Sequence, residues 1–221
     1  MEYMILIITM LITMGAQAFI NRWYNKTREI TSKKKITGRE VARKILDANG
    51  LKNVKVVEVS GTLTDHYDPQ AKTVRLSTDI HSNNSLASIS VASHECGHAI
   101  QDKDGYFFLR LRSRIVPLVN IASKLGYVAI MIGFIAGIVG FIRIGIIMEL
   151  VILLFQVITL PVEFNASNRA LKQIVELGMV DEEEHSYCKK MLTSAALTYV
   201  AGVATALLQI FRLVLISRSR D

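Results

Sequence analysis

The stretch SVASHECGHAIQ, residues 90–101, contains two histidines, His94 and His98, with Glu95 directly after the first. The polar residues 82–85 shortly before it supply a helix start, and a helix is expected from about residue 86 to 101. Because positions i and i+4 lie on one face of a helix, both imidazoles point to the same side and are able to hold one ion. This HExxH pattern therefore predicts a zinc site, and it is the feature around which the rest of the fold is expected to form.

Glu95 stands one position after His94, about 100° further round the helix. Its carboxylate is therefore expected beside the metal and not on it. Zinc lowers the pKa of a bound water toward about 7, and a carboxylate placed here serves as the general base and passes the proton to the leaving amine. A chance HExxH match on a polar helix is the alternative interpretation. The pattern favours a zinc metalloendopeptidase that requires Zn²⁺, with Gly97 leaving room for a close neighbour.

Four apolar blocks dominate the remainder of the sequence, at residues 3–20, 125–142, 144–162 and 195–216. Each has about 18 residues or more, which at about 1.5 Å per residue matches a bilayer core of about 30 Å. The turn between the second and third blocks is expected at Arg143. The predicted fold class is an integral membrane protein, mainly α with a small β element, with about four transmembrane helices and a zincin-like HExxH catalytic domain.

These blocks divide the chain into five predicted parts. They are a transmembrane anchor at 1–20, a zinc-binding catalytic domain with the HExxH helix at 21–114, a transmembrane helical hairpin at 115–162, helices completing the active site at 163–194, and a transmembrane helix and tail at 195–221.

Shorter signals predict the elements between the spans. Thr37 with Glu40 and Asp181 with Glu184 form capping boxes that each predict the start of a helix, and the second of these helices is expected to continue into the last span.

Strands are expected at residues 54–59 and 73–76, and a free edge of the second strand is the expected place for an extended substrate. Pro161 predicts a new helix from Val162 to Gly178, because proline is best tolerated at the first position of a helix.

The charge pattern predicts the orientation of the protein in the membrane. The chain has 26 Lys and Arg against 19 Asp and Glu, and nine of the basic residues fall between Arg22 and Lys44. A basic run directly after a span favours an anionic lipid leaflet, and no Arg and aromatic interleaving supports nucleic acid. Positive flanks are retained inside, so a multi-pass protein of the plasma membrane with a cytoplasmic active site is expected. The two cysteines form no disulfide framework.

Two residues are candidates for a third zinc ligand. Asp104 stands six residues after His98, where some zinc proteases place a ligand, but Gln101 occupies the position where that arrangement needs glycine. Glu163 follows the third span, and because two spans separate it from His98, both residues return to the same side of the membrane. The span count favours Glu163.

Four segments in order resemble the YugP-like bacterial neutral zinc metallopeptidases over nearly the whole chain. They are LTDHYDP at 63–69, HECGHAIQ at 94–101, TLPVEFNAS at 159–167 with Arg169 and Ala170, and AALTYVA at 195–201. The resemblance implies a zinc site of two His and one Glu, namely His94, His98 and Glu163. The segment around Glu163 is also similar to the membrane-bound gluzincins of the HtpX type.

In those gluzincins the motif is Glu-x-x-Ala-Asp, and the Asp braces a zinc-binding histidine. This chain has Ser167 at the Asp position, so the resemblance implies that Ser167 with water, or another residue such as Asp65, supports the histidine. Candidate donors to the oxyanion of the reaction are His66, Arg169 and Tyr199.

The expected partners are a protein or peptide substrate, associated with the membrane, and the lipid bilayer itself. Two other classes of protein compete with a peptidase. A transporter needs polar residues through the middle of several spans, and they are nearly absent. A membrane scaffold with a structural zinc and no peptidase activity usually closes the metal with four ligands, and no fourth His or Cys has suitable spacing.

Overall fold

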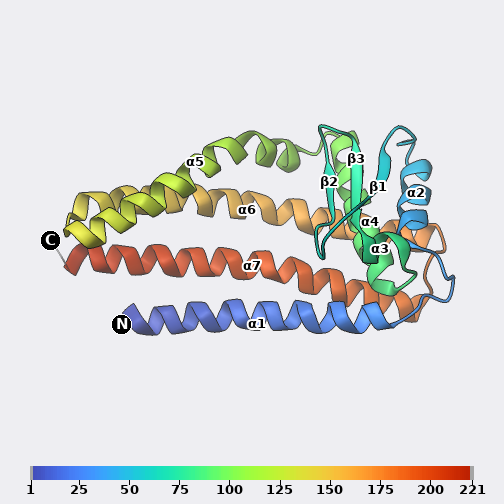
Figure 1. The fold of residues 1–221 in the computed structure, drawn as a ribbon, viewed down its shortest axis with the longest axis horizontal. Helices are drawn as coiled ribbons and strands as arrows, with labels where there is room; N and C mark the ends of the chain where they lie inside the picture. The colour runs from blue at the N-terminus through green and yellow to red at the C-terminus, as the bar shows by residue number, and fades with distance from the viewer. Residues whose placement is uncertain (1, 220–221) are drawn as a thin grey trace. The chain divides into compact units, whose positions relative to one another are not determined.

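A computed structural model describes residues 2–219 of the chain; residues 1, 220 and 221, at the outer ends of the predicted anchor and tail, lie outside the described residues. The elements can be followed in Figure 1. In chain order they are α1 (Glu2–Glu29), α2 (Gly38–Ala48), β1 (Lys55–Val59), β2 (His66–Asp68), β3 (Thr73–Ser77), α3 (Thr78–Ser82), α4 (Leu86–Lys103), α5 (Phe107–Ala136), α6 (Val139–Glu176) and α7 (Glu182–Ser219). The chain is mainly helical with one small sheet, as the sequence predicts.

The chain forms two compact units, each assembled from segments far apart in the sequence. The first, here called the helix unit, contains residues 2–17, 110–161 and 197–219. The second, here called the sheet unit, contains residues 18–109 and 162–196. The two units are described separately below.

The sheet unit is built on three strands in the order β1-β3-β2, with β3 in the middle (Figure 1). β1 pairs with β3 in parallel, and β2 pairs with β3 in an antiparallel ladder. Val74 and Leu76 of β3 are fully buried, because α2, α3 and α4 pack against the sheet. A capping box between Thr37 and Glu40 fixes the start of α2, as the sequence predicts.

The expectation of a free edge at residues 73–76 is wrong. This segment is the central strand β3, and both of its edges are hydrogen-bonded to neighbouring strands. Four of its five residues are buried, namely Thr73, Val74, Leu76 and Ser77, as expected for a strand with neighbours on both edges and helices packed against it. The outer strands are β1 and β2, and β2 contains His66.

The predicted HExxH helix is α4, which extends two residues beyond the expected end. Ser85 caps its first turn by accepting a hydrogen bond from the Ser88 amide. Asp104 is its C-cap, and Gly105 follows with φ +66°. A left-handed glycine just after the cap ends the helix without steric cost.

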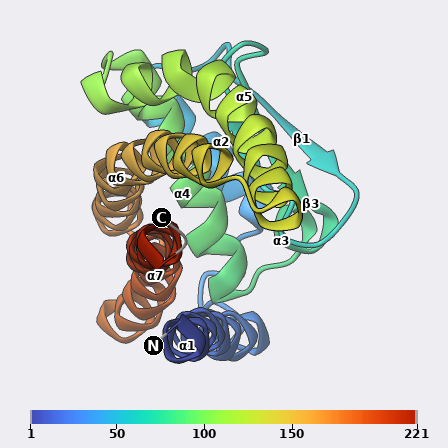
Figure 2. The same cartoon turned by 90° about the vertical axis from the view of Figure 1, so that its left-hand side faces the viewer.

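The helix unit is a bundle formed by segments of four helices, and Figure 2 views the end at which α5 turns into α6. The predicted turn at Arg143 is wrong, since α5 ends at Ala136 and α6 begins at Val139. Gly137 adopts φ +68°, which glycine takes without strain, and this lets the chain reverse six residues earlier than the isolated charge suggested. The basic side chain of Arg143 is exposed on α6.

Close packing between α5 and α6 depends on small residues. A Cβ on Gly126 would stand 2.8 Å from the Met148 Cβ, and a Cβ on Gly145 would stand 2.3 Å from a side-chain carbon of Ile130. Helices that meet through glycine approach more closely than larger residues allow, which is typical of membrane helix pairs.

The helix α6 passes through Pro161 without a break, so the prediction of a new helix at Val162 is wrong. Proline removes one backbone hydrogen bond, but the residues after it keep one apolar face of the helix. Val162, Ala166 and Ala170, spaced four apart, are all buried in the sheet unit and hold this part of α6 in place. The helix ends before Gly178, as expected.

After α6 the chain starts another helix at a second capping box, and both hydrogen bonds of this capping box are present. The Asp181 amide donates to Glu184, and the Glu184 amide donates to Asp181. The resulting helix α7 continues into the last apolar block, also as predicted.

The four helices α1, α5, α6 and α7 are each long and apolar enough to cross a membrane. In the most apolar window of each, 22% or fewer of the residues are buried inside the protein. Large apolar side chains therefore cover the outside of these helices, an arrangement that suits contact with lipid.

Candidate metal centre

His94, His98 and Glu163 lie together in the sheet unit, with one possible ligand atom of each within 4.8 Å of the others. The Glu163 Oε2 atom is 3.3 Å from the Nε2 atom of His94 and 3.7 Å from that of His98. The two imidazoles stand at 86° to each other, with centroids 4.8 Å apart. Both histidines therefore direct Nε2 toward the carboxylate, which comes from α6 while they come from α4.

The other ring nitrogen of each histidine has a protein partner. His98 Nδ1 lies 3.0 Å from Gln101 Oε1, and His94 Nδ1 lies 3.2 Å from Ser167 Oγ. A hydrogen bond at Nδ1 fixes the ring orientation and leaves the Nε2 lone pair for a metal. Of the two predicted braces, the structure brings Ser167 to His94, whereas Asp65 accepts hydrogen bonds from Ser77 instead.

Gln101 joins the two helices that provide the ligands. Its side chain is fully buried. While Oε1 faces His98, its Nε2 donates to the Val162 carbonyl at 2.8 Å and to Asn165 Oδ1 at 3.0 Å. One amide therefore holds a histidine of α4 and the backbone next to Glu163 in α6 at the same time.

Arg169 extends this hydrogen-bond network and forms an ion pair with Asp104. Its Nε donates to Asn165 Oδ1 at 2.8 Å, and its Nη1 donates to the Asp104 carboxylate. Asp104 thus caps the end of α4 and forms an ion pair with α6. It lies outside the cluster of metal-binding atoms.

Gly97 allows the two ligand helices to approach each other. A Cβ at this position would stand 2.5 Å from the Ala166 carbonyl oxygen and 3.1 Å from the Ala166 Cα. No ordinary side chain fits there unless the α6 backbone moves, so Gly97 sets the separation between the histidines and Glu163. The sequence predicted room for a close neighbour here, and the neighbour is α6.

The other two residues of the motif face different surroundings. Glu95 is buried on α4, and its charge contributes to raising the pKa of the neighbouring His98. Cys96 points away from the cluster, with its Sγ 3.6 Å from the Ala42 carbonyl of α2. Burial raises the pKa of the Cys96 thiol, which keeps it protonated and inert.

The donor set fits a zinc ion. Burial alone lowers the pKa of His98, but the facing carboxylate of Glu163 and the charge of Glu95 raise it, and the net shift is upward. Glu163 is only 3% exposed, and a buried carboxylate needs positive charge beside it. A divalent cation supplies that charge, and two imidazoles with one carboxylate are a ligand set found at catalytic zinc.

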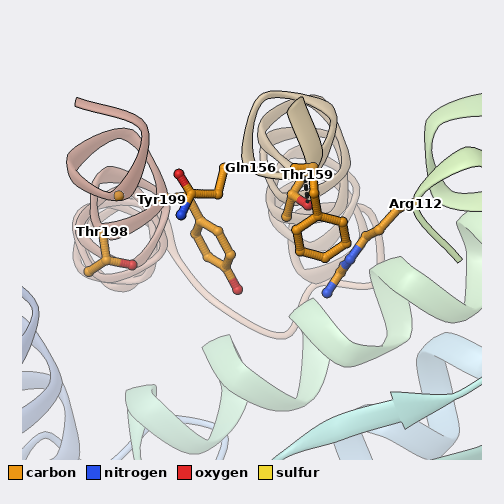
Figure 3. A pocket seen from close by; sticks show the side chains of 7 residues that line it. Arg112, Gln156, Thr159, Thr198 and Tyr199 are labelled. Atoms are coloured by element: carbon orange, nitrogen blue, oxygen red, sulfur yellow. Dashed lines mark hydrogen bonds between the residues drawn. The ribbon is translucent and has the colours of Figure 1, made fainter. Parts of the chain in front are cut away.

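The two remaining predicted residues are not part of the ligand cluster. His66 is exposed on β2, with its Nδ1 2.8 Å from the Thr64 carbonyl. Tyr199 belongs to the helix unit, where it lines a pocket of about 340 Å³. Figure 3 shows this pocket, to which Arg112, Gln156 and Thr159 also contribute polar side chains.

Comparison with known proteins identifies the class. Residues 2–218 match the family model described as "Putative neutral zinc metallopeptidase", and the chain belongs to this family. It is 43% identical over 201 residues to the "Putative membrane protease YugP" of Bacillus subtilis (strain 168), an alignment that covers 91% of this chain and 89% of that protein. No solved structure matches the chain.

The part of the site that the sequence did not predict is the role of Gln101. From the sequence, Gln101 was used only as a reason against Asp104 as a ligand. A signal was present, because Gln101 is three residues after His98 and so shares its helical face. A polar side chain on the face of a metal-binding histidine is a candidate hydrogen-bond partner for that ring.

Proposed function

We propose that the protein is a zinc-dependent endopeptidase that hydrolyses peptide bonds of membrane-associated proteins or peptides. The observation that carries the proposal is the convergence of His94, His98 and Glu163, with Glu95 beside them, in a chain of a zinc metallopeptidase family. The family supports a hydrolase, and the four long apolar helices support action at a membrane.

In the proposed mechanism, His94, His98 and Glu163 hold the metal, and Ser167 and Gln101 keep the two imidazoles in place. A zinc ion bound there supplies the Lewis acidity that makes a water molecule acidic near neutral pH. Glu95 takes a proton from the attacking water and delivers it to the nitrogen of the leaving amine.

Two candidate donors to the carbonyl oxygen of the scissile bond are His66, in the sheet unit with the metal ligands, and Tyr199, in the helix unit. Arg169 is the third candidate, but two of its nitrogen atoms already donate to Asn165 and Asp104. Its proposed contribution is therefore indirect, through the position of α6.

A substrate from the membrane is supported by the pocket of the helix unit. Arg112, Gln156, Thr159 and Tyr199 place polar groups in a hollow between helices that are otherwise apolar. Polar side chains inside apolar helices are costly and usually mark a functional position. Such groups suit the backbone of a peptide segment that leaves its own helix before cleavage.

The basic run after the first apolar block supports a plasma-membrane protein with the zinc site in the cytoplasm. The Asp181 to Glu184 cap and α2 lie in the same unit as the ligands, and the unit is rich in charged surface residues. This composition supports a water-facing position for the unit.

The test is the Glu95→Gln variant of the full chain, measured in detergent with labelled casein as a general substrate. Glu95→Gln should retain zinc and lose at least about a hundredfold in turnover, the usual scale for removal of a positioned general base. Glu182→Gln, an exposed change of the same kind, is the matched control. Near wild-type turnover in Glu95→Gln, or a zinc-loaded wild type with no turnover on casein or on its own membrane proteome, would favour the scaffold with a structural zinc.

A further inference from the structure

A second hollow lies in the sheet unit, away from the metal ligands. It has a volume of about 380 Å³ and is formed by two helices, α1 and α7. Its lining residues are aromatic, basic or hydroxyl-bearing: Phe19, Trp23, Ser186, Lys189, Lys190 and Thr193. This composition differs from that of an ordinary gap between helices, which is lined by aliphatic side chains.

The lining residues form two helical stripes. On α7 they are spaced at i, i+3, i+4 and i+7 from Ser186, so all four lie on one face. On α1 the aromatic residues Phe19 and Trp23 are one turn apart, and Lys26 continues the same face. The hollow is therefore built by regular faces of two helices and does not depend on a loop.

Ammonium groups from both helices gather on the aromatic rings. Lys26 Nζ is 5.4 Å from the centre of the Trp23 ring and 5.1 Å from that of Tyr187. Lys190 Nζ is 5.3 Å and 5.9 Å from the same two rings. Cation–π attraction holds both charges beside the hollow.

These charges have no anionic partner in the part of the chain that the structure describes. Among residues 2–219, no carboxylate forms an ion pair with Lys26, Lys189 or Lys190. Lys33 of the same unit provides the contrast, since it pairs with Asp181 and Glu183. Like charges brought together without a counter-charge repel each other, so the site favours an external anion.

The position along the helices identifies the source of that anion. The apolar block of α1 ends near Ile20, and the apolar block of α7 begins near Ala195. The hollow thus lies at the polar end of two apolar blocks, where phospholipid headgroups meet a membrane protein. Trp23 is typical of this level, because indole prefers the membrane interface.

We propose that this hollow binds the phosphodiester headgroup of an anionic phospholipid, with Lys26, Lys189 and Lys190 facing the phosphate and the Ser186 and Thr193 hydroxyls able to donate to its oxygens. Near an anionic membrane surface each lysine contributes roughly a fivefold preference. The site acts independently of the zinc chemistry, and its ligand is a lipid and not a soluble anion.

The chain offers a direct probe, because Trp23 is its only tryptophan. The full-length protein is reconstituted in two membranes of identical composition, a mixture of phosphatidylcholine and phosphatidylglycerol. In one membrane the phosphatidylglycerol carries bromine atoms, and in the other an equal mole fraction of phosphatidylcholine carries them. Random lipid neighbours quench Trp23 fluorescence equally in both, whereas an occupied site gives several-fold stronger quenching by the brominated phosphatidylglycerol.

The excess quenching should vanish when Lys26, Lys189 and Lys190 are all changed to glutamine and persist when all three are changed to arginine. Changing Lys52, Lys55 and Lys172 to glutamine removes the same charge from exposed positions and should leave the excess intact. If the glutamine variant fails to fold, the arginine variant still tests the proposal. It keeps the three positive charges, so the proposal is overturned if it loses the excess quenching.

Equal quenching by the two lipids in the wild type would overturn the proposal, as would an excess that survives in the folded glutamine variant. Displacement of the excess by soluble glycerol phosphate would also contradict it, since the ligand would then be a soluble anion. Removing zinc should leave the excess unchanged, so this result is independent of the peptidase test.

Discussion

Replacement of Gln101 by methionine, a side chain of similar length and volume, tests how the metal centre is held together. The change removes the acceptor of His98 Nδ1 and the donor to the Val162 carbonyl and to Asn165. Because Gln101 is fully buried, water does not replace these bonds. A buried polar group left without a partner costs about 1–3 kcal/mol, and loss of a hydrogen bond behind a metal ligand typically costs about 10–100-fold in affinity or activity.

The assay is a zinc titration of the metal-free protein against a competing chelator, with thermal unfolding of the same samples. Gln101→Met should bind zinc about 10–100-fold more weakly than the wild type. Gln101→Glu should keep zinc affinity closer to the wild type, because its carboxylate still accepts from His98. It should nevertheless destabilise the metal-free protein, since a carboxylate cannot donate to the Val162 carbonyl.

Gln70→Met is the control, because Gln70 is exposed in the same unit. A structural role alone would lower the stability of both Gln101 variants without separating their zinc affinities. The reasoning is refuted if Gln101→Met folds and binds zinc as tightly as the wild type.

Three further predictions concern the packing of the centre, its second brace and its orientation. Gly97→Ala should lower the free energy of unfolding by about 1–3 kcal/mol and weaken zinc binding, because its Cβ would stand 2.5 Å from the Ala166 carbonyl oxygen; unchanged zinc affinity in calorimetry would contradict this. Ser167→Ala should lower zinc affinity by less than Gln101→Met does, since a hydroxyl at 3.2 Å is the weaker brace, and a larger loss in the same titration would reverse the ranking. With both native cysteines replaced, a cysteine at Ile138, in the turn before α6, should react with an impermeant thiol reagent in intact cells and one at Lys34 should not; the opposite labelling would reverse the orientation.

Local signals predicted much of the fold. Capping boxes at Thr37 and Asp181 set helix starts that the structure confirms, because each is satisfied by residues within one turn. Pro161 led to the wrong prediction of a helix boundary. The helix α6 continues past it because Val162 and Ala166, directly after the proline, are buried against the rest of the sheet unit. The stability of that face depends on partners in α4, which local sequence signals do not reveal.

The candidate site divides in the same way. The spacing of His94 and His98 is a property of one helix and was readable from the sequence. Glu163 followed from the span count and from the family resemblance, and the structure brings its carboxylate to both histidines. The bond from Gln101 to the Val162 carbonyl joins residues 61 apart in the chain, and only the folded arrangement brings them together.

The zinc content of Glu163→Ala and Asp104→Ala, purified side by side and measured by mass spectrometry of the bound metal, decides which carboxylate is the third ligand. Glu163 faces both imidazoles, whereas Asp104 pairs with Arg169 outside the cluster. We expect Glu163→Ala to lose zinc and Asp104→Ala to retain it near one ion per chain. Zinc retained by Glu163→Ala and lost by Asp104→Ala would contradict the assignment.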